Sequence, residues 1–311
     1  MPCPYIAGRA GILPADVRER PSRDVRRGGW APVGGYKTLP YRIAEEMNRI
    51  DAKFSELNAS GQTGFIAYIT AGDPTLEVTG ELVLALERAG TDVIELGIPF
   101  SDPLADGPVN QAAAERALKH NVSLADIVRF TGELRKKTSI PVVFFTYFNP
   151  IFKYGVERFA QDAATAGVDG ALVVDLPPEE SSDYKAAMDA AGLSTVYLLA
   201  PTSTQHRIKL VSGNSTGFVY YVSRTGVTGM RESVEGSVKP MVEEIRGFTD
   251  KPVAVGFGIS KPQHVKEVAQ YADGVVVGSG IVRLVGELQD SPNVVSEVAG
   301  FAGELAAATK K

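Results

Sequence analysis

The sequence has very little cysteine and no long hydrophobic run. Its single cysteine, Cys3, cannot form an internal disulfide or a cysteine-rich zinc site, and one free thiol fits a reducing compartment. The longest apolar runs, such as residues 142–145, are far too short to span a bilayer. Hydrophobic residues still make up 44% of the 311 residues, so the chain can bury a sizeable core and general disorder is not expected.

The sequence also lacks a strong excess of either charge. Lysine and arginine total 32, aspartate and glutamate total 37, and the formal net charge is -5. A mildly acidic chain provides no general electrostatic attraction for nucleic acid or for anionic lipid. We therefore expect neither a nucleic acid nor a membrane among its partners.

The first forty residues differ from the rest in composition. They hold six glycines, six prolines and seven basic residues against three acidic ones, which leaves no room for a long helix or strand. We expect residues 1–40 to form a flexible, disordered arm. Its arginine content resembles an organelle transit peptide, whereas its acidic residues and single serine favour a gene-model extension. No apolar segment follows a basic start, so a secretory signal is not expected.

From residue 41 onward, strand-like and helix-like segments alternate. Ile43, Met47, Ile50, Phe54 and Leu57 recur at helical spacing and predict an amphipathic helix ahead of the first strand. Eight apolar, β-prone segments follow, at residues 65–70, 92–96, 142–147, 171–174, 195–199, 218–222, 253–256 and 274–278. The expected helices lie near residues 77–89, 123–137, 156–166, 179–191, 204–212, 233–246, 262–270, 281–287 and 293–308.

This alternation predicts a (β/α)8 barrel, the TIM barrel, over residues 41–311, with an extra N-terminal helix. Apolar strands without clean alternation are typical of parallel sheets that are covered on both faces. Eight strand–helix units in about 250 residues match this fold. A doubly wound sheet is the alternative, but it would have fewer strands and a glycine-rich turn after the first one. Here that turn is Ala-Gly-Asp-Pro at residues 71–74, so we favour the barrel.

Glu95 is the most unusual residue in the predicted strands. Period two places Val93 and Glu95 on one face of the second strand and Ile94 and Leu96 on the other, and both faces are expected to be dry. A buried carboxylate is costly unless it is paired or protonated. Glu95 is therefore either a paired residue that braces the barrel or an acid–base group whose pKa is raised by burial.

The loop after this strand offers two aspartates among three prolines and two glycines. Asp102 precedes Pro103, and an aspartate in that position is commonly part of a turn. Asp106 could instead close over a bound ligand and meet Glu95 from the other side. Two carboxylates that converge in this way form an acid–base pair, and strand ends are where such barrels have their active sites.

Three further strand ends carry small residues that suit an anion. The loops are SRTGVTG at residues 223–229, GFGIS at 256–260 and GSG at 278–280, the last of which leads into a helix. Glycine lets backbone N–H groups approach an anion, and a helix N-terminus favours negative charge. Turn geometry alone would explain one such loop, but three at these strand ends predict a phosphate site. None fits the Gly-Lys-Ser/Thr pattern of a nucleotide triphosphate loop.

Other common catalytic groups are missing from the strand ends. The three histidines, His120, His206 and His264, fall in expected helices or at their starts, which argues against a histidine-ligated metal and against serine–histidine chemistry. No lysine lies in a predicted strand, so a Schiff-base aldolase would lack its nucleophile. What remains is metal-free proton transfer by carboxylates on a phosphorylated substrate.

The segment ELGIPFSDPLADGP at residues 95–108 resembles the hallmark motif of the tryptophan synthase α subunit family. Asn149 and Pro150 after the third strand, GVTG at 226–229, GFGIS at 256–260, and Gly278 with Ser279 complete the match. The resemblance covers about residues 43–290 and leaves the N-terminal arm outside. It implies a (β/α)8 barrel that cleaves indole-3-glycerol phosphate to indole and glyceraldehyde 3-phosphate, by a retro-aldol reaction of tryptophan biosynthesis.

The resemblance also implies roles for individual residues. Glu95 matches the glutamate that protonates indole C3, Asp106 the aspartate that handles the indole N–H proton, and Tyr220 a tyrosine near the reacting centre. The implied phosphate-binding residues are Gly229, Gly258, Gly278 and Ser279. The implied wall of the indole pocket consists of Tyr68, Leu172 and Phe257. Thr228 lies in a loop that, like the loop of Asp106, is expected to close on the substrate.

Members of this family work with a separate β subunit that carries pyridoxal phosphate. The resemblance therefore implies an α2β2 assembly, with no cofactor and no metal on this chain. The residues that match partner-facing loops are Asp102, Pro103, Asn149 and Pro177. Two alternatives stay open: a standalone lyase that releases free indole, and a catalytically idle regulatory subunit, against which the presence of both Glu95 and Asp106 argues. We expect the plastid stroma for a photosynthetic eukaryote and the cytoplasm otherwise.

Overall fold

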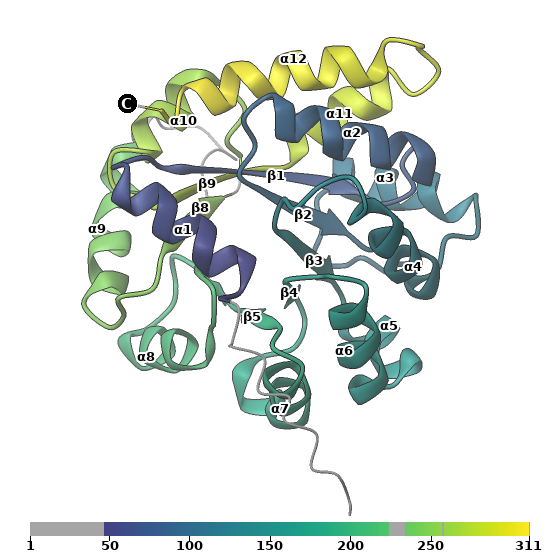
Figure 1. Cartoon of the computed structure of the whole chain (residues 1–311). Helices are drawn as coiled ribbons and strands as arrows, with labels where there is room; N and C mark the ends of the chain where they lie inside the picture. Colours follow the sequence, from purple (N-terminus) through teal and green to yellow (C-terminus); the bar gives the residue numbers. More distant parts are fainter. Residues whose placement is uncertain (1–46, 224–233, 257, 311) are drawn as a thin grey trace, which may run out of the picture. The chain divides into compact units, whose positions relative to one another are not determined.

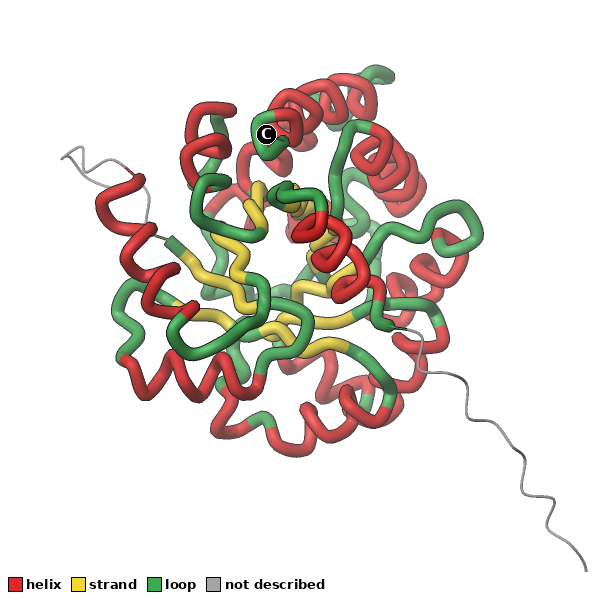
Figure 2. The backbone as a smooth tube through the Cα atoms, turned by 60° about the vertical axis from the view of Figure 1, so that its left-hand side comes forward, coloured by secondary structure: helices red, strands yellow, loops and turns green. Residues whose placement is uncertain are grey.

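The structure, a computed structural model, describes residues 47–223, 234–256 and 258–310. The expected arm over residues 1–40 lies outside these residues, and so does Ile43 of the first predicted helix. Within the described residues, strands lie at the centre and helices surround them (Figure 1 and Figure 2).

In this part of the chain, nine parallel strands form one sheet in the order β5-β4-β3-β2-β1-β9-β8-β7-β6. The strands are β1 (Gly64–Thr70), β2 (Val93–Gly97), β3 (Val142–Thr146), β4 (Gly170–Val173), β5 (Ser194–Val196), β6 (Leu198–Leu199), β7 (Val219–Val222), β8 (Val253–Gly256) and β9 (Gly274–Val277). The two ends of the order, β5 and β6, are separated in the chain only by Tyr197. The first and last strands of the order are therefore neighbours along the chain, as in a closed barrel.

Backbone hydrogen bonds close the sheet between β5 with Tyr197 on one side and β7 with the segment before it on the other. The Thr216 N–H donates to the Thr195 carbonyl at 2.7 Å, and the Tyr220 N–H donates to the Tyr197 carbonyl at 3.2 Å. The predicted barrel is thus confirmed, and its fifth expected strand, residues 195–199, is divided in two at Tyr197.

The helices form a layer outside the strands (Figure 2). They are α1 (Arg49–Ala59), α2 (Leu76–Arg88), α3 (Pro108–Leu118), α4 (Leu124–Leu134), α5 (Phe148–Tyr154), α6 (Val156–Thr165), α7 (Ser182–Ala190), α8 (Gln205–Asn214), α9 (Val234–Arg246), α10 (Pro262–Val268), α11 (Ser279–Glu287) and α12 (Val294–Ala307), with a short 3-10 helix η1 (Pro178–Glu180) before α7. The last helix, α12, packs beside α2, so the helical layer closes next to the first strand–helix unit (Figure 1).

α3 and α5 are not among the helices predicted from the sequence, and both begin close to the carboxyl ends of strands. The buried residues of α3 are Ala113, Ala114 and Ala117, so its inner face has no large apolar side chain to reveal the helical period. Its start is marked by Pro108 at the first helical position. α5 spans only seven residues, too few for a clear periodicity.

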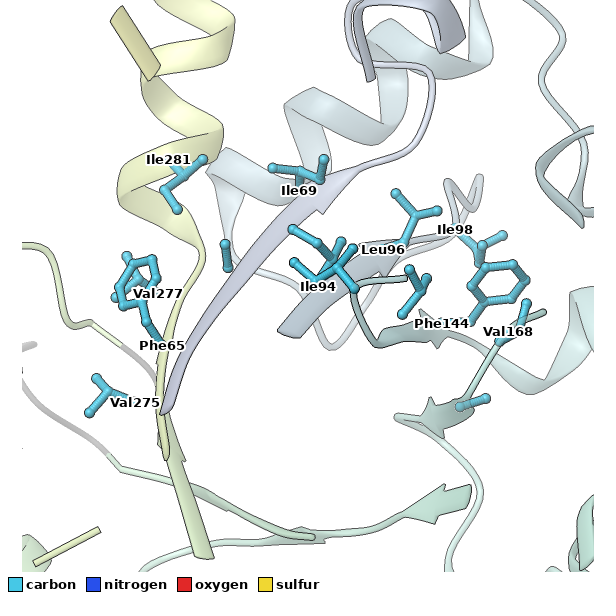
Figure 3. Close-up of a cluster of buried hydrophobic side chains, with 14 of the residues drawn as sticks. Phe65, Ile69, Ile94, Leu96, Ile98, Phe144, Val168, Val275, Val277 and Ile281 are labelled. Atoms are coloured by element: carbon cyan, nitrogen blue, oxygen red, sulfur yellow. The ribbon is translucent and has the colours of Figure 1, made fainter. Parts of the chain in front are cut away.

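The strands bury both of their faces. Ile94 and Leu96 of β2 pack in the larger hydrophobic core toward the helices, together with Ile281 of α11 (Figure 3). Val93 belongs to a second cluster that lies inside the barrel and includes Val143 of β3. The expected alternation along β2 is therefore confirmed, and it points Glu95, like Val93, into the barrel.

α1 closes the amino end of the barrel. Its buried side chains are Ile50, Phe54 and Leu57, and they share one cluster with the residues inside the barrel. A Cβ atom on Gly64, at the start of β1, would lie 3.0 Å from Leu57, and one on Gly274, at the start of β9, 3.5 Å from Phe54. Because α1 fills this end, room for a ligand is left at the opposite end of the strands.

Three aspartates stand immediately before strands at this amino end. Each carboxylate accepts a hydrogen bond, at 2.7 or 2.8 Å, from a backbone N–H near the start of a neighbouring strand. The pairs are Asp92 with Phe65, Asp169 with Val142 and Asp273 with Val253. These bonds fix the register of adjacent strands where α1 meets the sheet.

Candidate active site

A cavity of about 370 Å³ opens at the carboxyl ends of the strands. Its lining residues are Tyr68, Glu95, Ala105, Asp106, Gly107, Pro108, Val109, Asn110, Phe145, Val174, Leu198, Tyr220, Val222, Gly258, Val276, Gly278 and Ser279. The walls are mostly apolar and carry a few convergent polar groups, which is the usual composition of a small-molecule site. The position agrees with the carboxyl-end rule for active sites in such barrels.

Glu95 extends from β2 into this cavity and is 1% exposed. Neither of its carboxylate oxygens has a hydrogen-bond partner among the described residues. Burial raises the pKa of Glu95 to about 8, because the charged form is poorly solvated there. Glu95 is therefore protonated near neutral pH, and the geometry favours an acid–base group over a paired residue that braces the barrel.

Two tyrosines share the cavity with Glu95. Tyr68 is its register partner on the neighbouring strand β1, and Tyr220 comes from β7. A Cβ atom at Gly97 would overlap the Tyr68 hydroxyl, and one at Gly256 would overlap that of Tyr220, so both glycines make room for the rings. Burial first, and then the nearby carboxylates, raise the pKa of both tyrosines, so the phenols remain neutral.

Asp106 reaches the cavity from the loop between β2 and α3. The Tyr147 hydroxyl donates to Asp106 Oδ2 at 3.1 Å and accepts the Ala105 N–H at 2.9 Å. The side-chain amide of Gln111 donates to the backbone carbonyl of Asp106 at 2.9 Å. Burial raises the pKa of Asp106, while hydrogen bonds from Tyr147 and Asn110 oppose that rise. Asp106 is thus a carboxyl group held in place by donors, unlike Glu95.

Another part of the lining offers backbone N–H groups. Gly258 has a φ of +76°, a conformation that favours glycine, and Gly278 and Ser279 form the N-terminus of α11. No lysine, arginine or histidine occurs among the described residues that line the cavity. An anion there would be held by N–H groups and by the helix terminus. Gly229 and Thr228, which the sequence assigns to the phosphate site and a closing loop, lie outside the described residues.

The sequence matches a known protein family over most of its length. The family model of the tryptophan synthase alpha chain matches residues 54–310. The chain belongs to this family. The tryptophan synthase alpha chain of Solibacter usitatus (strain Ellin6076) is 51% identical over 259 residues, and that of Geobacter sp. (strain M21) is 49% identical over 259 residues. Each alignment covers 83% of this chain and 97% of the relative.

Solved structures of tryptophan synthase alpha chains share the fold. The subunit alpha of Legionella pneumophila str. Paris has a TM-score of 0.79 at 36% identity, and the alignment covers 85% of this chain and 99% of that one. A chain of tryptophan synthase from M. tuberculosis, in an aminoacrylate- and BRD0059-bound form, has a TM-score of 0.77 at 32% identity, with 86% and 100% covered. As a member of this family, the protein is a lyase of tryptophan biosynthesis that cleaves indole-3-glycerol phosphate to indole.

The predicted indole pocket contains only some of the residues that were expected to line it. Tyr68 lines the cavity as expected. Leu172 is fully buried in the cluster inside the barrel and is not among the residues that line the cavity. Phe257 lies outside the described residues. The aromatic partner of Tyr68 is instead Phe145, whose ring meets it edge to face with centroids 5.2 Å apart.

The residues expected to face a partner lie on three connected segments: the loop after β2, the first turn of α5 and the loop between β4 and η1. These residues are Asp102, Pro103, Asn149 and Pro177, of which Asp102 and Asn149 are exposed. Tyr147 binds the first loop through Ala105 and precedes α5, and the Phe148 N–H at the start of α5 donates to Asp175 Oδ1 at 2.7 Å in the third segment. The three segments are therefore joined by hydrogen bonds around the carboxyl end of β3.

Several residues of the site were not predicted. Phe145 and Val174 line the cavity, and each stands two positions beyond an interior residue of the same chain segment, Val143 and Leu172. Period-two spacing from those interior positions would have found them. Asn110 and Tyr147 carry no such signal, because Asn110 lies in a helix that the sequence pattern did not reveal and Tyr147 meets Asp106 only through the tertiary fold.

Within residues 47–223, 234–256 and 258–310, no group of three or more histidine, cysteine, aspartate or glutamate side chains could hold a metal ion. In the same residues, no helix has the length and apolar composition needed to cross a membrane. The relatives named above are bacterial, and the cellular location stays a prediction.

Proposed function

We propose that indole-3-glycerol phosphate is cleaved in the cavity at the carboxyl end of the barrel, with Glu95 as the proton carrier and Asp106 as the acceptor of the indole N–H. The observation that carries this proposal is the contrast between the two carboxyl groups. Glu95 is buried without a partner among the described residues, whereas Asp106 is held by hydrogen-bond donors. Two carboxyl groups whose surroundings differ in this way can serve as acid and as anionic acceptor at one pH.

The lining of the cavity indicates how the substrate would lie. The rings of Tyr68 and Phe145 offer an aromatic wall for the flat indole group. The N–H groups around Gly258, Gly278 and Ser279 would bind the phosphate at the N-terminus of α11. The phosphate is remote from the bond that breaks, and its binding holds the substrate in a reactive geometry.

The reaction then needs one proton to move in each direction. Glu95 gives its proton to C3 of the indole ring, and the ring becomes a cation whose N–H faces the Asp106 carboxylate. The bond between C3 and the glycerol carbon breaks, and its electron pair returns to the ring. The hydroxyl on that carbon becomes the aldehyde of glyceraldehyde 3-phosphate as its proton passes to the Glu95 carboxylate. Glu95 is regenerated, and each positioned proton carrier typically contributes about 10²–10⁴-fold to the rate.

We also propose that a pyridoxal phosphate-dependent β subunit docks on the loop that carries Asp102 and on the start of α5, which carries Asn149. Two large apolar side chains on these segments face solvent, Leu104 at 91% exposure and Phe152 of α5 at 68%. Exposed apolar side chains that gather with polar neighbours are typical of an interaction surface. The loop that carries Asp102 also carries Asp106, so this surface is continuous with the cavity.

Indole release from indole-3-glycerol phosphate by the purified chain, with and without a β subunit from a bacterial relative, tests these proposals. We expect slow release by the chain alone and a marked rise with the β subunit. Leu104→Glu should remove that rise while leaving the rate of the isolated chain unchanged. Fast release that ignores the β subunit would identify a standalone lyase, and no release in either mixture would contradict the reaction.

A further inference from the structure

A buried ion pair at the carboxyl end of the barrel has no part in the reaction described above. Arg116, near the end of α3, donates to both carboxylate oxygens of Asp73, from Nε and from Nη2, each at 2.8 Å. Asp73 lies in the turn that follows β1. Its side chain is 1% exposed, and that of Arg116 is 20% exposed. A bidentate pair at this depth fixes the position of α3 relative to the end of β1.

The Arg116 guanidinium also lies against a third element, α11. A Cβ atom on Gly286 would lie 2.7 Å from Arg116 Nη2, too close for a side chain to be added without displacing the guanidinium. Glycine weakens a helix, and in α11 it lets the guanidinium approach the helix backbone. Arg116 therefore connects α3, the turn after β1 and α11.

The opposite ends of α3 and α11 reach the cavity. α3 begins at Pro108, directly after the loop that carries Asp106, and Gln111 of α3 donates to the Asp106 carbonyl at 2.9 Å. α11 begins at Ser279, among the N–H groups that would bind the phosphate. The position of Asp106 thus follows α3, and the position of the phosphate follows α11.

Apolar packing alone leaves room between these two helices. A hollow of about 350 Å³ opens between them, and its lining includes Pro108 and Val109 of α3 and Val282 of α11. The small cluster that joins the helices consists of Ala113 of α3, Val282 of α11 and Tyr68 of β1. Because apolar side chains do not fill the space between the helices, their spacing needs a further contact.

We propose that Asp73 and Arg116 are positioning residues, which set the spacing of α3 and α11 and with it the distance between the Asp106 carboxylate and the bound phosphate. Neither residue is among those that line the cavity, so an effect on the reaction must pass through the two helices. This inference rests on the proposed function.

The experiment measures kcat for indole release and stability in urea for variants of the full chain. Asp73→Asn removes one charge of the pair. Arg116→Lys is the milder change, because lysine keeps the positive charge but loses the bidentate donor and the contact with Gly286. We expect kcat per folded molecule to fall about tenfold to a hundredfold in both variants, since a misplacement of about 1 Å can cost about 10²-fold.

A second measurement separates positioning from damage to the phosphate site. Glycerol 3-phosphate carries the phosphate without the indole ring, and its inhibition constant reports phosphate binding alone. We expect this constant to be nearly unchanged in both variants, because the N–H donors at the start of α11 do not depend on α3. Each half of the site would thus be intact, while the whole substrate would no longer fit both halves at once.

Asp169→Asn is the matched control. Asp169 is as buried as Asp73, and it also pairs with an arginine, Arg135 of α4, but at the amino end of the barrel. The control should lose stability in urea while its kcat per folded molecule stays the same. A purely stabilising pair at Asp73 would give this same result.

The outcomes that overturn the inference are therefore distinct. An unchanged kcat in either folded variant, Asp73→Asn or Arg116→Lys, would do so, and so would a marked loss of glycerol 3-phosphate binding. Failure of the proposed function looks different, because Glu95→Gln and Asp106→Asn would then keep the full kcat of an active chain.

Discussion

At the amino end of the barrel, Asp92, Asp169 and Asp273 each accept a strand N–H and also pair with a basic side chain. At the carboxyl end, Glu95 has no partner among the described residues, and the polar side chains that contact Asp106 are neutral. The carboxyl groups that line the cavity are therefore treated in the opposite way to the aspartates at the amino end.

The most buried of the paired aspartates shows what the difference means. Asp169 is 2% exposed and accepts hydrogen bonds at 2.6 Å from Arg135 of α4 and Arg49 of α1, besides the Val142 N–H. Its charge is thereby compensated, and it ties two helices to the sheet. Glu95 is buried as deeply without compensation, and under the proposed function its free energy cost is retained because it supplies a proton. The stabilising interactions at the amino end thus offset the free energy cost of burying Glu95 at the carboxyl end.

Glu95→Gln should give the largest effect, and at the carboxyl end alone. Glutamine has nearly the same shape but no proton to give, so kcat should fall by about 10²–10⁴-fold or more while the fold and phosphate binding remain. In the unmodified chain, kcat/KM should fall above about pH 8, because Glu95 must be protonated in the free enzyme. Near-normal turnover of the variant would remove Glu95 from the reaction.

Relative to the unmodified chain, the Glu95→Gln variant should become increasingly stable as the pH rises. The folded chain keeps the Glu95 proton up to about pH 8, whereas the unfolded chain loses it near the ordinary pKa of 4.5. Between these values the unfolded state binds fewer protons, so the stability of the unmodified chain declines with rising pH. Glutamine does not titrate, and thermal unfolding across this range should show that decline in the unmodified chain only. Parallel curves would mean that Glu95 has a partner in solution.

Asp169→Asn should give the next largest effect, and on stability. The variant keeps an oxygen for the Val142 N–H but leaves Arg135, which is 11% exposed, without its counter-charge. Loss of one member of a buried ion pair typically costs about 3–5 kcal/mol. Urea unfolding would measure this cost, and kcat per folded molecule should be unchanged because the cavity lies at the other end. A large fall in kcat with an intact fold would show that the two ends are coupled.

The strands could be predicted because each is an apolar segment buried on both faces, and the barrel follows from their number and spacing. The division of the fifth strand at Tyr197 has no local signal, since residues 195–199 form one β-prone segment. α3 was missed because alanines make its buried face, and α5 because it is short. Both depend on packing that only the folded chain provides.

The site could be predicted as far as single strand ends and their loops allow. Glu95 is out of place in an apolar strand, and Asp106 follows in the next loop, so both were found. The hydrogen bond from Tyr147 to Asp106 was not, because Tyr147 is 41 residues away and meets Asp106 only when β2 and β3 lie side by side. The pairing of Asp169 with Arg49 was hidden for the same reason, since 120 residues separate them.

Asp273→Asn should give the smallest effect. Like Asp169, Asp273 accepts a strand N–H and pairs with an arginine, but its ion pair is exposed. Asp273 also accepts a strand N–H, from Val253 at 2.8 Å, and asparagine keeps an oxygen for it. Only the ion pair with Arg246 is lost, and because Asp273 is 39% exposed this pair is screened by water and salt. We expect a cost of at most about 1 kcal/mol in urea unfolding, and less at high salt. If the two variants cost the same, the strand N–H bond rather than the buried charge pair would be what stabilises the amino end.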